Sequence, residues 1–121
     1  MKVLLVEDDH DQLSVRGMLL RANGFHALEA SDSAAALTLA SAERPECAVV
    51  DLRLPTEERG FDLIRDLKRL DAAIHVFVLT GADPGKVGRR AGPGLVDEVV
   101  VKGSPSSELI GKLRVVEAEM A

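Results

Sequence analysis

Five short apolar runs, separated by segments with helical spacing, constrain the fold of this chain more than any other feature. The runs cover residues 2–6, 25–30, 47–51, 74–79 and 99–102. Unbroken apolar runs of this length are typical of strands that are buried on both faces of a parallel sheet. Strands that alternate with helices predict right-handed crossovers between parallel neighbours. We therefore expect an α/β protein with (βα)5 order, a doubly wound five-stranded parallel sheet with helices on both faces.

The segments between these runs carry helix signals. Apolar residues recur in them at helical spacing, and capping residues or breakers stand at their ends. The predicted helices cover residues 11–22, 34–43 and 61–69, and a last helix runs through Met120. A polar loop from Pro55 to Gly60 is expected to precede the third helix. Ser106 or Ser107 is expected to cap the last one.

The stretch before the fifth run departs from this regularity. Five of the ten glycines lie between Gly81 and Gly94. Each interior glycine costs a helix about 1 kcal/mol relative to alanine. The fourth helix is therefore expected to be short, mobile or irregular. Within it, Arg89 and Arg90 are expected to form a solvated charged pair.

Composition and charge narrow the function. A chain of 121 residues, of which 46% are hydrophobic and 29% charged, is expected to form one soluble domain over residues 1–121. No apolar run approaches the roughly 20 residues that cross a bilayer, so we expect a cytoplasmic protein without a membrane partner. The net charge of −5 opposes direct binding to nucleic acid. The single cysteine, Cys47, excludes an internal disulfide.

The ends of the predicted strands carry most of the candidate chemistry. In chain order these residues are Glu7 and Asp8, then Asp51, Thr80 and Lys102. In open α/β sheets, ligands bind beyond the carboxyl ends of the strands, which a parallel arrangement brings together. Three converging carboxylates repel one another and favour a hard cation such as Mg²⁺. The ammonium group of Lys102 can pair with Asp51 or with phosphate oxygens.

In these residues the sequence resembles the receiver domain of bacterial two-component response regulators, a flavodoxin-like fold, over essentially the whole chain. Glu7 and Asp8 look like the acidic pair of that family, and Asp51 looks like its phospho-accepting aspartate. Thr80 resembles the family's switch hydroxyl, and Lys102 resembles its active-site lysine. The order of these five residues on the predicted strands carries the resemblance.

The resemblance implies a phosphoryl-accepting signalling module of a phosphorelay. Asp51 would accept a phosphoryl group from a phosphohistidine on a sensor histidine kinase or a phosphotransfer protein, with Mg²⁺ bound. Asp8 would bind the metal directly and Glu7 through water, and Asp51 and the carbonyl group of Arg53 would complete the protein ligands. The chain would phosphorylate and dephosphorylate itself without turning over an outside substrate, so it would not be an enzyme in the usual sense.

The same resemblance implies roles outside the metal site. Asp51, Thr80 and Lys102 would form the catalytic set, and Pro55 and Gly60 resemble the loop that follows the acceptor. The change at Asp51 would be relayed through Thr80 and the surface of residues 83–102 to a downstream protein partner. No output domain is expected within the chain. The final strand and helix would be the natural surface of a homodimer.

The sequence departs from the family pattern at positions that act after phosphorylation. Val99 stands where the family usually has an aromatic residue, whose rotamer follows the switch hydroxyl. Gly103 stands where a proline with a cis peptide is usual, so the bond before it is expected to be trans or the loop less rigid. Residues 83–94 are hypothesised to be a bistable element that orders or repacks on phosphorylation; the alternative is a loop that merely tolerates glycine. Arg53 and Ala82 correspond to positions that tune dephosphorylation.

Two other functions remain open from the sequence. A pseudo-receiver would bind partners without being phosphorylated, and an Asp51→Asn variant with unaltered biological output would indicate it. A Mg²⁺-dependent phosphohydrolase or nuclease would also place acids at strand ends around a metal. Such enzymes generally need a further acid two residues after the first, and Arg53 holds that position. Turnover of a generic phosphoester would indicate this class.

Overall fold

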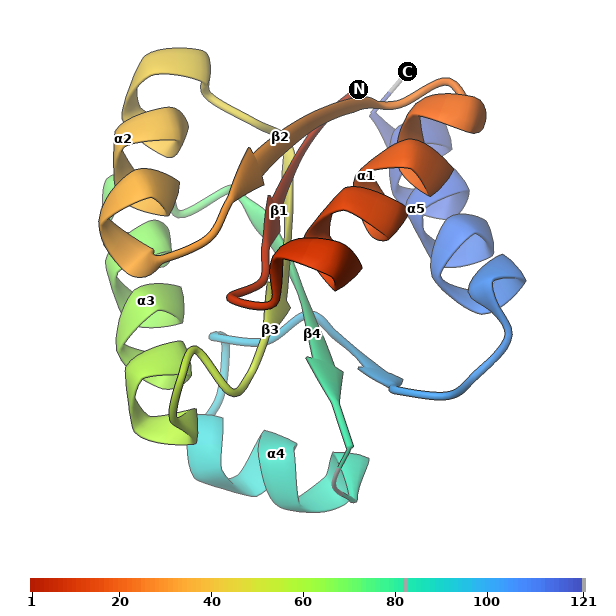
Figure 1. Ribbon diagram of the computed structural model, residues 1–121. Helices are drawn as coiled ribbons and strands as arrows, with labels where there is room; N and C mark the ends of the chain where they lie inside the picture. Colours follow the sequence, from red (N-terminus) through yellow and green to blue (C-terminus); the bar gives the residue numbers. More distant parts are fainter. Residues whose placement is uncertain (82, 121) are drawn as a thin grey trace.

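The computed structural model, which describes residues 1–81 and 83–120, contains one parallel sheet with the strand order β2-β1-β3-β4-β5 (Figure 1). The strands are β1 (Lys2–Val6), β2 (His26–Ala30), β3 (Cys47–Asp51), β4 (His75–Thr80) and β5 (Glu98–Val101). No bound differs from the sequence prediction by more than one residue. The predicted α/β class, (βα)5 order and flavodoxin-like topology are confirmed.

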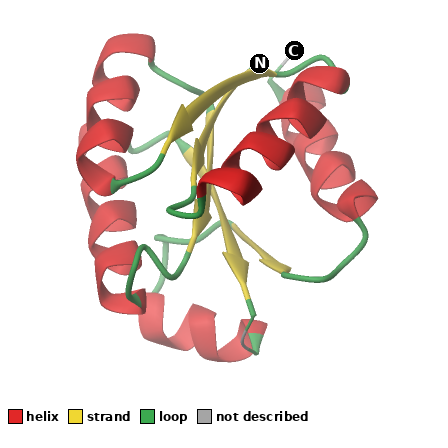
Figure 2. Ribbon diagram, in the orientation of Figure 1, coloured by secondary structure: helices red, strands yellow, loops and turns green. Residues whose placement is uncertain are grey.

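Helices cover both faces of the sheet (Figures 1 and 2). The helices are α1 (His10–Ala22), α2 (Ser33–Glu43), α3 (Glu57–Leu70), α4 (Pro84–Ala91) and α5 (Ser106–Glu119). Alternate strand residues point to opposite faces. Thus Leu4 of β1 packs with the α2, α3 and α4 side, whereas Val3 packs with the α1 and α5 side. In the part of the chain that is described, no helix is long and apolar enough to cross a bilayer.

α3 begins one turn earlier than predicted, which corrects the expected polar loop from Pro55 to Gly60. Thr56 caps the helix, because its hydroxyl oxygen accepts a hydrogen bond from the Arg59 amide at 3.3 Å. Two acidic residues in the first turn, Glu57 and Glu58, are favoured by the helix dipole. Gly60 therefore lies inside the helix instead of ending a loop.

α5 also begins differently from the prediction. Pro105 occupies its N-cap position and makes no side-chain capping hydrogen bond. Ser106 is already the first helical residue, so neither Ser106 nor Ser107 is the cap. The fixed φ of proline, −55° here, suits entry into a helix without a side-chain acceptor. The predicted end is confirmed, because Met120 is the C-cap.

α4 shows that part of the glycine-rich segment is helical. The helix has eight residues, Pro84 stands in its first turn, and the Asp83 carboxylate accepts a hydrogen bond from the Gly85 amide at 2.9 Å. Gly92 ends it with a φ of +79°, a value that favours glycine. Its buried side chains belong to Val87 and Ala91. The expectation of a short fourth helix is confirmed.

Asp97 ties the start of β4 to the segment that leads into β5. Its carboxylate accepts hydrogen bonds from the Lys68 ammonium at 2.9 Å and from the Val76 amide at 2.8 Å. Lys68 Nζ also donates to the carbonyl of Ile74 at 2.6 Å. Burial alone would raise the pKa of Asp97, but the hydrogen bonds from Lys68 and Val76 outweigh it and hold that pKa below its ordinary value of 3.8.

Replacing Asp97 by alanine is expected to lower the free energy of unfolding by about 1 to 3 kcal/mol near neutral pH, because two donors lose their acceptor. The folded-state pKa is depressed, so this stabilisation is present above the unfolded-state pKa and is lost as the pH falls through the folded-state pKa. Urea unfolding of both proteins from neutral pH to below about pH 4 measures it, and the difference should shrink on acidification.

Asp62→Ala is the matched control for this prediction. It removes an exposed ion pair with Arg65 within α3, and such pairs contribute less than about 1 kcal/mol. A stability difference between Asp97→Ala and the wild type that stays constant as the pH falls would contradict the role given to the Asp97 carboxylate.

Candidate functional site

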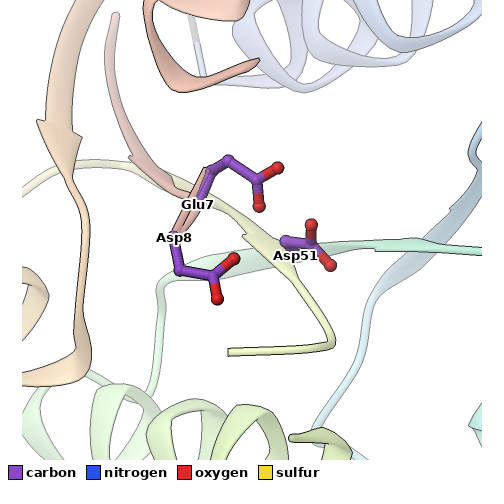
Figure 3. A group of neighbouring side chains, drawn as sticks. All are labelled: Glu7, Asp8 and Asp51. Carbon is purple, nitrogen blue, oxygen red and sulfur yellow. The ribbon is translucent and has the colours of Figure 1, made fainter. Parts of the chain in front are cut away.

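Neighbouring strands bring three carboxylates to one edge of the sheet. β1 pairs in parallel with β3, so the residues that follow β1 lie beside the end of β3. Glu7 and Asp8 come from the first of these strand ends and Asp51 from the second, and Figure 3 shows the three side chains as neighbours. One carboxylate oxygen from each residue lies within 4.8 Å of the others. The expected convergence of acids is therefore present.

Asp51 is 3% exposed and is held by two hydrogen-bond donors. The Lys102 ammonium donates to Oδ2 at 2.6 Å, and the Arg53 amide donates to Oδ1 at 3.1 Å. The backbone of Lys102 is placed by β4, because its amide donates to the Thr80 carbonyl at 2.7 Å. The lysine therefore reaches Asp51 from the far side of the strand that lies between them.

The electrostatic surroundings keep the Asp51 carboxylate ionised. Burial alone would raise the pKa of Asp51. The hydrogen bonds with Glu7 and Lys102, the positive charge of Lys102 and the Arg53 amide lower it more, so the pKa of Asp51 lies below its ordinary value. An ionised, buried carboxylate with one cationic neighbour is suited to act as a nucleophile or as a metal ligand.

Glu7 is 1% exposed and has the opposite shift. Burial raises the pKa of Glu7 to about 7, and the neighbouring Asp51 acts in the same direction, whereas Arg16 and Lys102 oppose the rise. Arg16 Nη1 lies 3.3 Å from Glu7 Oε1. Glu7 Oε2 is buried and finds no donor among the described residues. Two facing carboxylates are stable only if they share a proton or bind a cation.

The other predicted residues line a hollow beside Asp51. The hollow has a volume of about 280 Å³, and its lining includes Arg53, Glu57, Thr80 and Gly81. Thr80 is 4% exposed and is the last residue of β4. A Cβ atom added to Gly81 would have no described atom within 4 Å. There is consequently free space next to Thr80 and the Asp51 carboxylate, large enough for a small anion.

The structure shows the backbone at two positions, Gly103 and Val99, where the sequence departs from the family pattern. The bond between Lys102 and Gly103 is trans, as expected, and Gly103 has a φ of +91°, which favours glycine. Val99 pairs with Val78 of β4, two positions before the pair formed by Thr80 and Val101. Ala82, named above as a tuning position, lies outside the described residues.

Sequence reasoning missed three residues around the site. Arg16 pairs with Glu7, and Glu57 lines the hollow. Arg90 is exposed, as expected, but its guanidinium also forms an ion pair with Glu57, which was not predicted. Gln12 and Arg16 stand four residues apart on a predicted helix, a spacing that favours the hydrogen bond between them. Arg90 and Glu57 stand 33 residues apart, so their pairing leaves no local signal in the sequence.

Comparisons with known proteins agree with this arrangement. The family model of the response regulator receiver domain matches residues 3–114. Transcriptional regulatory protein PrrA of Mycobacterium tuberculosis is 32% identical over 116 residues, which are 93% of this chain and 48% of PrrA. Sporulation initiation phosphotransferase F of Bacillus subtilis is 24% identical over 79 residues, or 65% of this chain and 63% of that protein.

Solved structures give the same fold. The receiver domain of the Francisella response regulator 1452 has a TM-score of 0.87 and 22% sequence identity, and the match covers 99% of this chain and 98% of that one. At this identity the likeness concerns the fold alone. The chain spans about half the length of PrrA, at 48%.

Proposed function

This chain belongs to the family of response regulator receiver domains, and from that premise we propose that Asp51 accepts a phosphoryl group from a phosphohistidine on a sensor histidine kinase or a phosphotransfer protein. The observation that carries the proposal is the contact of 2.6 Å between the Lys102 ammonium and a buried, ionised Asp51 at the centre of an acidic cluster. We further propose that residues 1–121 form one receiver domain, which acts in the cytoplasm.

The proposed reaction is an in-line displacement at phosphorus. An Asp51 carboxylate oxygen forms the new bond to phosphorus as the bond from phosphorus to the imidazole nitrogen of the donor breaks, and the imidazole leaves with that electron pair. Phosphoryl transfer depends mainly on positioning and on neutralising charge. The Lys102 ammonium moves from the carboxylate towards the transferred oxygens, and the Thr80 hydroxyl donates to the same group. No outside substrate is turned over.

The donor set fits Mg²⁺. Carboxylate oxygens are the ligands that Mg²⁺ prefers. The Glu7 carboxylate belongs to the acidic cluster, and its buried Oε2 finds no donor among the described residues. Asp8 would hold the ion directly, Glu7 through water, and Asp51 and the Arg53 carbonyl would complete the protein ligands. When bound, Mg²⁺ would neutralise negative charge on the phosphoryl oxygens. Asp8 is exposed, which gives the cluster access to solvent.

The consequence of phosphorylation is proposed to spread from β4. Thr80 at the end of β4 would turn towards the phosphoryl group, and the surface of residues 83–102 would change its packing and contact a downstream protein partner. The hydrogen bond between Thr80 and the Lys102 amide supports this route, because it joins the end of β4 to the loop after β5. A net charge of −5 supports a protein partner rather than nucleic acid for this domain.

The test is intact-mass spectrometry after incubation with a small-molecule phosphodonor, with and without Mg²⁺. The wild type is expected to gain one phosphoryl group only when Mg²⁺ is present, and Asp51→Asn, which keeps the size of the side chain, is expected to gain none. Asp62→Asn on α3, an exposed position, is the matched control and should gain the group normally. A wild type that gains no group from such donors or from a phosphorylated kinase would indicate a pseudo-receiver instead.

A further inference from the structure

A second connection joins the hollow beside Asp51 to α4, and it does not pass through Thr80. Glu57, the first residue of α3, lines this hollow. The guanidinium of Arg90 on α4 forms an ion pair with the Glu57 carboxylate. A neighbouring hollow of about 470 Å³ is lined by both Glu57 and Arg90 and also by Arg53, so the two hollows share one wall.

Arg90 is held by α3 in two ways. Besides the ion pair, its guanidinium lies over the ring of Phe61, with 5.1 Å between the guanidinium carbon and the ring centroid. Phe61 is 3% exposed and lies one helical turn after Glu57. A cation above an aromatic face is attracted to it. The arginine is therefore fixed on α3 by charge on one side and by the ring on the other.

α4 is a helix that one such contact can influence. It has eight residues, and its buried side chains are those of Val87 and Ala91. Gly85 and Gly88 lie within it, and each interior glycine weakens a helix relative to alanine. Short elements with few buried apolar side chains lie at the low end of local stability. Losing or changing the partner of Arg90 therefore changes one of the contacts that hold α4 against α3.

Resting on the proposed function, we propose that Glu57 and Arg90 couple the charge at Asp51 to the packing of α4. A phosphoryl group adds one to two negative charges to a hollow that Glu57 already lines. This charge repels Glu57 and attracts Arg90. The free energy of the ion pair therefore differs between phosphorylated and unphosphorylated Asp51. Coupling is reciprocal, and a change in the pair must therefore alter the affinity of the site for a phosphoryl group.

The test uses beryllofluoride, a phosphoryl analogue, whose affinity is measured in the presence of Mg²⁺ by isothermal titration calorimetry. Arg90→Gln leaves the Glu57 charge uncompensated and is expected to weaken beryllofluoride binding by about two- to fivefold, the range of a partly exposed ion pair. Glu57→Gln removes that charge and is expected to strengthen binding by a similar factor. Arg89→Gln makes the same charge change one residue away and should alter the affinity less than about twofold.

Amide hydrogen exchange over residues 84–91 gives the second readout. Beryllofluoride is expected to change exchange in this helix in the wild type and in Arg89→Gln, and to change it less in Arg90→Gln and in Glu57→Gln. Affinities of Arg90→Gln and Glu57→Gln that equal that of the wild type, or that shift in the same direction, would overturn the coupling while leaving the proposed function intact. A wild type that binds no beryllofluoride with Mg²⁺ would overturn both.

Discussion

Replacing Gly60 by alanine is expected to lower the free energy of unfolding by about 3 kcal/mol or more, the range of severe steric mutations. A Cβ atom at this position would lie 2.0 Å from the carbonyl oxygen of Leu52 and 2.9 Å from its carbonyl carbon. The clashing atoms belong to the backbone, so no side-chain rotation relieves the contact. The chain between β3 and α3 would have to move, together with the backbone next to Asp51.

Urea unfolding measures this effect, and Gly111→Ala is the matched control. Gly111 lies inside α5, and a Cβ atom added there would have no described atom within 4 Å. The same substitution should therefore stabilise the protein by up to about 1 kcal/mol through helix propensity. Opposite signs for the two variants are expected. Equal unfolding midpoints for Gly60→Ala and the wild type would mean that α3 does not approach the Leu52 carbonyl this closely.

Replacing Lys102 by glutamine is expected to change two measured quantities in opposite directions. The phosphorylation rate should fall by on the order of a hundredfold, because one preorganised cationic donor to the transferred oxygens is lost. The affinity for Mg²⁺ should rise severalfold, because a positive charge 2.6 Å from Asp51 no longer competes for the acidic cluster. A merely destabilised protein would lose both functions together.

The rate is followed by intact-mass spectrometry with a phosphodonor, and Mg²⁺ binding by calorimetry on the same samples. Lys112→Gln on α5 is the matched control, because the Lys112 ammonium pairs with Glu98, the first residue of β5, rather than with Asp51. It should leave both quantities unchanged. A Lys102→Gln protein that is phosphorylated at the wild-type rate would remove Lys102 from the proposed catalytic set.

The strands were predictable because burial on both faces imposes a strong local pattern. All five residues of β3 are buried, as the apolar run that ends at Asp51 predicted. Parallel pairing then places the strand ends together, so the order of the candidate residues along the chain already implied the convergence of Glu7, Asp8 and Asp51. Their proposed roles follow from the chemistry of the side chains rather than from the fold.

The errors arose where a distant contact decided a local choice. Gly60 was predicted to end a polar loop, whereas it lies inside α3, where the Leu52 carbonyl leaves no room for a Cβ atom. Arg90 is exposed, as a solvated charge would be, but its contacts with Glu57 and Phe61 on another helix were not predicted. Neither contact has a periodic signature, so no reading of local sequence patterns would have found it.

The division of the apolar interior into two layers has a consequence for how such a chain can change over generations. One layer lies between the sheet and α1 and α5, and the other between the sheet and α2, α3 and α4. Substitutions in different layers share few contacts, so their effects on stability should add. Sequence drift on the α4 side needs no compensating drift on the α1 side. A lineage can therefore repack one layer while inheriting the other layer intact.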